Sequence, residues 1–217
     1  MPSSLLLSLK VSLLATIIVA LCGVVVAFAL ARASFRGKNL VEAAMLLPMV
    51  LPPTVTGYYL IMLLGRYGVL GRHIYAWTGW NIMFTWQAAV VAAAVVSFPI
   101  MVTTAQSAIE AVDREMIDSS TMLGYSRLET ARHIILPLAW RGIFSGIALA
   151  FTRSLGEFGA TLMLAGNIPG RTDTMPLAIY AAAASGDWER AHVLVLTLTL
   201  MSVFMLVAAR GLSRRLL

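Results

Sequence analysis

Residues 118–137 read DSSTMLGYSRLETARHIILP and belong to the longest polar stretch of an otherwise apolar chain. Gly124 predicts a break between two short helices, because glycine commonly ends a helix. Ser126 and Glu129 have the spacing of a capping box, so the second helix should begin at Ser126. Pro137 fits the first turn of the helix that follows. We therefore expect a helical hairpin between two longer segments.

The composition on both sides of this stretch excludes a soluble protein. Hydrophobic residues make up 59% of the 217 residues and charged residues only 12%. A typical soluble domain is about 25% charged. A soluble enzyme or a disordered chain is therefore excluded, and the membrane is the expected environment. The single cysteine, Cys22, cannot form a disulfide within the chain.

Five apolar runs are long enough to cross a bilayer, which takes about 20 residues in a helix. We expect one all-α transmembrane domain over residues 1–217, with a cytoplasmic segment at about 107–137 between the third and fourth spans. The first run is longer than the core of a signal peptide and ends in basic residues, so we expect it to be retained. The predicted spans are about 11–31, 43–65, 84–106, 138–164 and 191–209.

The net charge of +6 is a signal of topology rather than of nucleic-acid binding. Five spans place three regions on one side of the membrane, namely residues 32–42, 106–141 and 210–217. These hold ten Lys and Arg residues, against five on the other side. The positive-inside rule then puts the N-terminus outside and the C-terminus in the cytoplasm.

Prolines interrupt the second predicted span. Pro48, Pro52 and Pro53 are followed by two threonines, Thr54 and Thr56. Each proline removes a backbone hydrogen bond, and the freed groups need partners inside the protein. A kink with local repair is one explanation. Three prolines before two hydroxyl side chains favour a broken helix facing a cavity, where exposed donors would suit an oxyanion.

The fourth predicted span carries two charges. Arg153 and Glu157 are four residues apart, so they share one helix face and can pair. Charges at this depth cost about 2.5–3.5 kcal/mol each on insertion scales, and they normally pair or face water. We expect a structural and gating role rather than direct contact with a substrate. Neighbouring small residues, Ser154 among them, allow another helix to approach closely.

The polar stretch resembles the cytoplasmic signature loop of ABC-importer permeases. The family pattern is Glu-Ala-Ala, three residues, Gly, and then Ile-x-Leu-Pro, with 13 positions from Gly to Pro. Here the interval from Gly124 to Pro137 is the same, although Asp-Ser-Ser replaces Glu-Ala-Ala and Ala131 stands at a usually aromatic position. The resemblance implies a coupling helix that fits a groove on an ATPase subunit. The expected coupling residues are Asp118, Ser119, Ser120, Gly124, Ile134, Leu136 and Pro137.

Two membrane segments narrow the resemblance. RSLGEFGAT at 153–161 and LPPTVTG at 51–57 are similar to molybdate permeases of the molybdate/sulfate-type ABC importer family. This implies import of molybdate, and of tungstate as a nearly isosteric dianion. Sulfate or another oxyanion is the alternative substrate. The residues expected to form the translocation path or its gate are Pro52, Pro53, Thr54, Thr56, Arg153, Ser154 and Glu157.

The resemblance also implies a fold and partners. We expect the type I ABC-importer permease fold in the plasma (inner) membrane, with lipid around a homodimer, two ATPase subunits and an extracytoplasmic molybdate-binding protein. The chain has no GxxxxGK[ST] phosphate loop, so ATP and Mg²⁺ should bind the separate ATPase chain. We expect no enzyme activity and no cofactor on this chain, and its histidines lack the spacing of a metal site.

Two other classes of membrane protein are possible on sequence grounds. An ion-gradient-driven secondary carrier would need ionisable groups at the midplane and usually internal repeats. Only Arg153 and Glu157 qualify, and no repeat is evident. A structural scaffold would not need the spaced Gly124 and Pro137. Both classes therefore fit the sequence less well than an ATP-driven importer working by alternating access.

Overall fold

The protein is described here by a computed structural model that covers residues 2–215, and every regular element in this range is helical. The helices are α1 (Pro2–Arg32), α2 (Lys38–Val50), α3 (Pro53–Leu64), α4 (Gly71–Thr78), α5 (Trp86–Glu110), α6 (Arg114–Met122), α7 (Arg127–Thr130), the π-helix η1 (Ala131–Ile135), α8 (Leu136–Leu155), α9 (Gly159–Ala165), α10 (Met175–Ala184) and α11 (Trp188–Arg215).

Four helices are long and apolar enough to span a membrane. They lie in α1, in α5, in the continuous helix Arg127–Leu155 formed by α7, η1 and α8, and in α11. The bent pair α2 and α3 makes a fifth span if it is counted as one. The expectation of an all-α membrane protein is confirmed, with four or five candidate spans.

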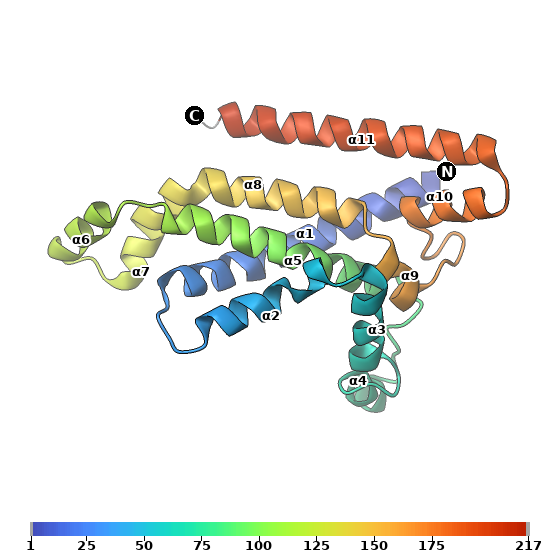
Figure 1. The fold of residues 1–217 in the computed structure, drawn as a ribbon, viewed down its shortest axis with the longest axis horizontal. Helices are drawn as coiled ribbons and strands as arrows, with labels where there is room; N and C mark the ends of the chain where they lie inside the picture. The colour runs from blue at the N-terminus through green and yellow to red at the C-terminus, as the bar shows by residue number, and fades with distance from the viewer. Residues whose placement is uncertain (1, 216–217) are drawn as a thin grey trace.

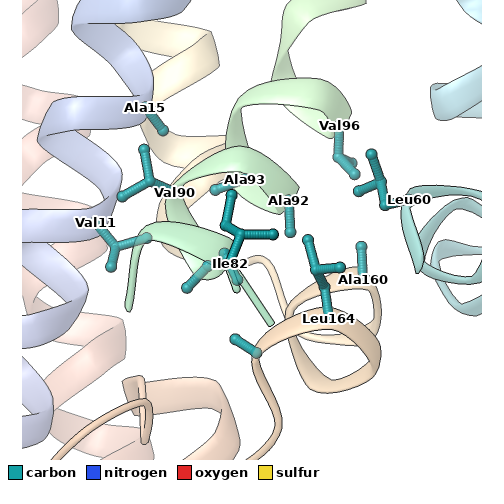
Figure 2. Packing of buried hydrophobic residues seen from close by; sticks show 13 residues of the cluster. Val11, Ala15, Leu60, Ile82, Val90, Ala92, Ala93, Val96, Ala160 and Leu164 are labelled. Atoms are coloured by element: carbon teal, nitrogen blue, oxygen red, sulfur yellow. The ribbon is translucent and has the colours of Figure 1, made fainter. Parts of the chain in front are cut away.

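Helix α5 is the centre of the bundle. In its most apolar stretch 61% of the residues are buried, against 11% for α11. Helices α1 and α8 lie along α5, whereas α11 runs along one side of the bundle and contacts α8 and α10 (Figure 1). Figure 2 shows how side chains of α1, α3 and α9 close around the alanine-rich start of α5. Small side chains on α5 let several helices approach it.

Glycines set how closely α1 and α8 approach α5. A Cβ atom at Gly23 of α1 would lie 2.8 Å from Cγ of Met101, and one at Gly142 of α8 would lie 2.2 Å from Cβ of Ala108. Neither distance is compatible with ordinary packing, and the methyl group of Ala108 has no rotamer with which to move away. These positions therefore require glycine for contact rather than for backbone freedom.

The second expected span, 43–65, corresponds to the bent pair α2 and α3. Helix α2 ends at Val50, and α3 begins at Pro53 after a bend of 112°. Leu51 is extended, as a residue before proline is forced to be, and neither Pro52 nor Pro53 can donate the backbone hydrogen bond that would continue α2. The break at Pro52 and Pro53 was expected from the sequence, but its angle was not.

The fourth expected span, 138–164, is shifted and broken. Its helix begins at Arg127, on the far side of Pro137, and ends at Leu155. After a three-residue break the chain resumes as the short helix α9. The carboxylate of Glu157 binds the backbone N–H of Ala160, and this local bond competes with continuation of the helix. The apolar pattern alone did not reveal this stop.

Helix α10 lies between the fourth and fifth expected spans. It is apolar, and Met175, Leu177, Ala178 and Ala182 are buried. Ten residues are too few to cross a bilayer at 1.5 Å per residue. The preceding loop is tied to the start of α1, where Ser4 Oγ donates to Asp173 Oδ2 at 2.8 Å. Figure 1 shows α10 and the start of α1 at one end of the molecule, with α6 and α7 at the other.

We predict that Gly142→Ala destabilises the bundle. The added methyl group would meet Ala108 at 2.2 Å, and overpacking of this kind typically costs about 1–3 kcal/mol. Thermal unfolding in detergent, followed by tryptophan fluorescence, should show a lower midpoint. Gly211→Ala in α11 is the matched control, because its Cβ would meet no atom within 4 Å. Equal midpoints for the two variants would contradict the tight contact between α5 and α8.

Candidate functional site

The polar hairpin consists of α6, a turn at Gly124, and α7, and we call it the α6–α7 hairpin. Asp113 caps α6 by accepting a hydrogen bond from the N–H of Glu115 at 3.0 Å. Gly124 has φ +84°, a left-handed conformation that favours glycine. The predicted break at Gly124 is therefore confirmed, and the backbone there requires the glycine.

The predicted capping box at the start of α7 is also confirmed. Ser126 N–H donates to Oε2 of Glu129 at 2.8 Å, and Ser126 Oγ accepts from Glu129 N–H at 3.3 Å. Hydrogen bonds from the Ser126 side chain and backbone hold the pKa of Glu129 below its usual value. The charged form is the one that is bonded, so the box is intact at neutral pH and weakens only as the pH falls through that lowered pKa.

One face of α6 is fixed to the neighbouring helix. The Ser120 side chain is buried, and its Oγ lies 2.9 Å from Oγ1 of the buried Thr130. Ser120 also donates to the carbonyl of Ile117 at 2.6 Å. This hydroxyl pair explains why a serine can replace the alanine of the family pattern at this position. It holds α6 against the end of α7.

The hairpin exposes large apolar side chains although it lies beyond the ends of the long apolar helices. Met122 and Leu128 are 89% and 79% exposed. Three other exposed apolar side chains, Met116, Leu123 and Tyr125, line an open groove of about 690 Å³. Apolar side chains gathered on a polar segment mark an interaction surface. The exposed apolar side chains are Met116, Met122, Leu123, Tyr125 and Leu128.

The structure brings four of the seven expected coupling residues around this groove. Its lining includes Ser119, Ser120, Ile134 and Pro137. The other three take different positions in the same region. Asp118 is exposed on α6, Gly124 forms the turn, and Leu136 is the first residue of α8.

A π-helical turn joins the hairpin to α8. Residues Ala131–Ile135 form η1, directly before Pro137 in the first turn of α8. Proline within a regular helix would clash with the carbonyl four residues earlier, and a wider turn relieves that clash. The helix therefore runs unbroken from Arg127 to Leu155 despite the proline.

The two membrane segments singled out in the sequence meet in space at the start of α3 and the start of α9. A Cβ atom on Gly159 would lie 2.7 Å from Cβ of Pro53 and 3.4 Å from N of Thr54. One turn further along α3, a Cβ atom on Gly57 would lie 3.0 Å from Cα of Ala160. The expectation that small residues here allow close approach is confirmed, and the partner helix is α3.

Arg153 and Glu157 form the predicted pair. Arg153 Nη2 lies 2.8 Å from Glu157 Oε2, a contact that has the distance of an ion pair but not the geometry of a hydrogen bond. The Glu157 side chain is 2% exposed and that of Arg153 31% exposed. Oε1 of Glu157 accepts from Ala160 N–H at 2.9 Å, so this carboxylate also caps α9. The pair therefore joins the end of α8 to the start of α9.

The remaining path candidates differ in exposure. Pro52, Pro53 and Thr54 are exposed, whereas Thr56 is buried and its Oγ1 has no hydrogen-bond partner among the residues that the structure describes. Ser154 is buried and donates to Oγ of Ser97 on α5 at 3.0 Å.

Sequence reasoning missed Ser97 and the link between Ser4 and Asp173. Ser97 stands alone in an apolar run, and nothing local signals its partner on α8. Ser4 and Asp173 are 169 positions apart. The repeat of hydroxyl residues every fourth position on α1, at Ser4, Ser8, Ser12 and Thr16, was the only available signal.

Residues 11–217 match the family described as the binding-protein-dependent transport system inner membrane component. This chain belongs to that family. It is therefore a multi-pass protein of the inner membrane and a transport subunit rather than an enzyme.

Relatives in this family match nearly the whole chain. The molybdenum transport system permease protein ModB of Escherichia coli K12 is 42% identical over 205 residues, covering 94% of this chain and 90% of the relative. The putative molybdenum transport system permease protein YvgM of Bacillus subtilis is 42% identical over 200 residues, covering 92% and 88%. A probable sulfate transport system permease protein of Chlorokybus atmophyticus is more distant, 33% identical over 204 residues, covering 94% and 71%.

Solved ABC transporters share the fold of this inner membrane component. One is a bacterial transporter involved in the import of alginate, with a TM-score of 0.81, 14% identity, and coverage of 98% of this chain and 78% of that chain. Another is the MetNI methionine transporter in an inward-facing conformation, with a TM-score of 0.76, 15% identity, and coverage of 99% and 94%. The expected ABC-importer permease fold is thus confirmed.

We predict that Arg153→Met destabilises the protein and that Arg153→Met combined with Glu157→Gln restores most of the loss. The single change leaves a buried carboxylate without its cation, which costs up to about 3–5 kcal/mol. The double variant removes both charges, and the glutamine oxygen can still accept from Ala160. Melting of the purified protein measures both effects. A double variant no more stable than the single one would rule out charge pairing as the cause.

The same double variant separates stability from gating. We expect it to melt near the parent temperature while substrate uptake in cells is reduced, because the pair joins α8 to α9 at the path candidates. Full uptake by this stable double variant would show that the pair has no gating role.

Proposed function

We propose that this chain is the permease subunit of an ATP-driven importer of molybdate, and also of tungstate. The observation that carries the proposal is the 42% identity to molybdenum transport permeases over more than nine tenths of the chain. The sulfate relative is less similar, which favours molybdate over sulfate or another oxyanion. The segments at 51–57 and 153–161, whose pattern suggested molybdate, lie side by side at the junction of α3 and α9.

In this proposal the α6–α7 hairpin docks into a groove on a separate ATPase chain. Its exposed apolar side chains supply the contact, and the groove lined by Ser119, Ser120, Ile134 and Pro137 receives part of the partner. Asp118 provides an exposed carboxylate on α6. ATP and Mg²⁺ belong to that partner, and this chain needs no cofactor.

The translocation path runs past the junction of α3 and α9. Pro52, Pro53 and Thr54 present an exposed helix start there. Arg153 is the partly exposed cation nearest in sequence to that junction, and Glu157 holds it in place. Thr56 Oγ1 is buried without a partner, so a small movement of α3 can turn it toward a passing oxyanion. Ser154 secures the end of α8 against α5.

The assembly that suits this mechanism is a homodimer with two ATPase subunits and an extracytoplasmic molybdate-binding protein, surrounded by lipid. The type I arrangement has the N-terminus outside and the C-terminus in the cytoplasm. The opposite placement of the N-terminus and the α6–α7 hairpin along the bundle supports it (Figure 1). So does the excess of basic residues in the three regions assigned to the cytoplasm.

Uptake competition tests the substrate. We expect labelled molybdate uptake by cells that express the complete transporter to be blocked by unlabelled tungstate as effectively as by molybdate, and only weakly by sulfate. The physical reason is the near identity in size and charge of the first two dianions. Competition by sulfate equal to that by molybdate would overturn the molybdate assignment.

The same cells test the energy source. Inactivating the ATPase subunit should abolish uptake, whereas collapsing the ion gradient with ATP maintained should leave it intact. The reverse pattern would identify a secondary carrier.

We predict that Gly124→Pro releases the ATPase without preventing membrane insertion. Proline cannot adopt φ +84°, and it removes the hydrogen bond from Gly124 N–H to the carbonyl of Thr121. Gly186→Pro is the matched control, because Gly186 has φ +79° and an equivalent bond to Ala183 at the other end of the bundle. Co-purification of the ATPase measures the outcome. Equal retention in the two variants would contradict the coupling assignment.

A further inference from the structure

A second cavity lies on the other side of the α6–α7 hairpin from the groove already described. It has a volume of about 580 Å³ and is bounded by the last turn of α1, by α6 and by η1. These elements gather at one end of the molecule (Figure 1). Neither the coupling residues nor the path candidates line it.

The charge of this cavity is positive. Arg32 at the end of α1 and Arg127 at the start of α7 both line it, and no acidic residue does. Within residues 2–215 neither guanidinium lies within 4.0 Å of a carboxylate. Two like charges at one cavity repel each other, so an anion between them would be held by both. The hydroxyl groups of Ser34 and Tyr125 add hydrogen-bond donors.

The neighbouring groove provides a comparison within the same hairpin. Asp113, Glu115 and His133 line that groove, and neither Arg nor Lys does. The two hollows flank α6 with opposite electrostatic character. The positive cavity is thus not a general property of a basic cytoplasmic segment but is confined to one side of the hairpin.

The position of the cavity matches the surface of the bilayer. Arg32 ends the apolar helix α1, and Phe28 lies one turn further into the membrane on the same cavity wall. The apolar side chain of Phe28 lies on the membrane side of the two arginines. This arrangement can receive a lipid phosphate at the arginines with its acyl chain beside Phe28. Basic pockets at the cytoplasmic ends of membrane helices bind anionic headgroups.

We propose that this cavity binds a tetrahedral phosphate-type oxyanion, with Arg32 and Arg127 as its ligands and Ser34 and Tyr125 as additional donors. The planar guanidinium group suits such an anion because it donates two parallel hydrogen bonds. The headgroup of an anionic phospholipid is the source that fits the position, and free inorganic phosphate carries the same chemistry. The site is separate from the transported substrate, and it attaches the α6–α7 hairpin to the end of α1.

The test compares two double variants of the transporter purified with its ATPase. Arg32→Gln with Arg127→Gln removes the cavity ligands. Arg36→Gln with Arg132→Gln is the control, because it removes the same charge from two exposed arginines outside the cavity. Each protein is placed in nanodiscs of phosphatidylcholine alone or of phosphatidylcholine mixed with phosphatidylglycerol. Native mass spectrometry then counts retained phosphatidylglycerol, and equilibrium binding of labelled phosphate is measured in the phosphatidylcholine discs.

We expect the parent and the control to retain phosphatidylglycerol and the cavity variant to bind it at least about tenfold more weakly, the scale of a lost charge-assisted hydrogen bond. Saturable phosphate binding lost only in the cavity variant would support the site with free oxyanion as the source. Equal binding by the cavity variant and its control, or binding of neither ligand by the parent, would overturn the proposal. If the double variant fails to fold, Arg127→Gln compared with Arg132→Gln decides the question.

Discussion

Backbone groups inside a bilayer must find hydrogen-bond partners within the protein, and this constraint governs where the chain can break. Two breaks lie within membrane segments, at Leu51–Pro52 and at Gly156–Phe158. The broken ends lie against each other at the junction of α3 and α9, where Gly57 and Gly159 allow contact without intervening side chains. The Glu157 carboxylate accepts a hydrogen bond from the N–H of Ala160, which would otherwise lack a partner. The two breaks are thereby brought together in one place.

A single helix connects this place to the α6–α7 hairpin. The helix runs from Arg127 to Leu155, and at 1.5 Å per residue its 29 residues extend about 44 Å. The π-helical turn lets it continue through Pro137. The hydroxyl pair of Ser120 and Thr130 fixes α6 to the N-terminal end of this helix, and Arg153 lies near its C-terminal end. In the proposed mechanism, a movement imposed on the hairpin would reach Arg153 along continuous backbone rather than through a chain of side-chain contacts.

Local signals in the sequence predicted the local features well. The turn at Gly124, the capping box of Ser126 and Glu129, and the pairing of Arg153 with Glu157 each depend on residues within four positions, so spacing was sufficient. The helices in the second and fourth spans begin and end at other residues than the apolar runs, because an apolar run records only that a segment is away from water. It does not record whether a glutamate within the run caps a new helix, or through what angle two prolines turn the chain. Helix α10 was missed for a related reason, since ten apolar residues lie below the length that indicates a span.

By itself the sequence determined that the chain lies in a membrane, that it is all-helical with about five candidate spans, and where the hairpin lies. These features follow from composition, run length and short-range spacing. Only the tertiary structure decided that α5 is the centre, that α3 meets α9, that Ser154 bonds to Ser97, and that Asp173 lies buried against Ser4. The three contacts, and the packing of helices around α5, join residues that are tens of positions apart or more. Such contacts are decided by which side chains are small enough for close approach once all the helices are packed together. That choice is made jointly by distant residues, and no single stretch of sequence contains it.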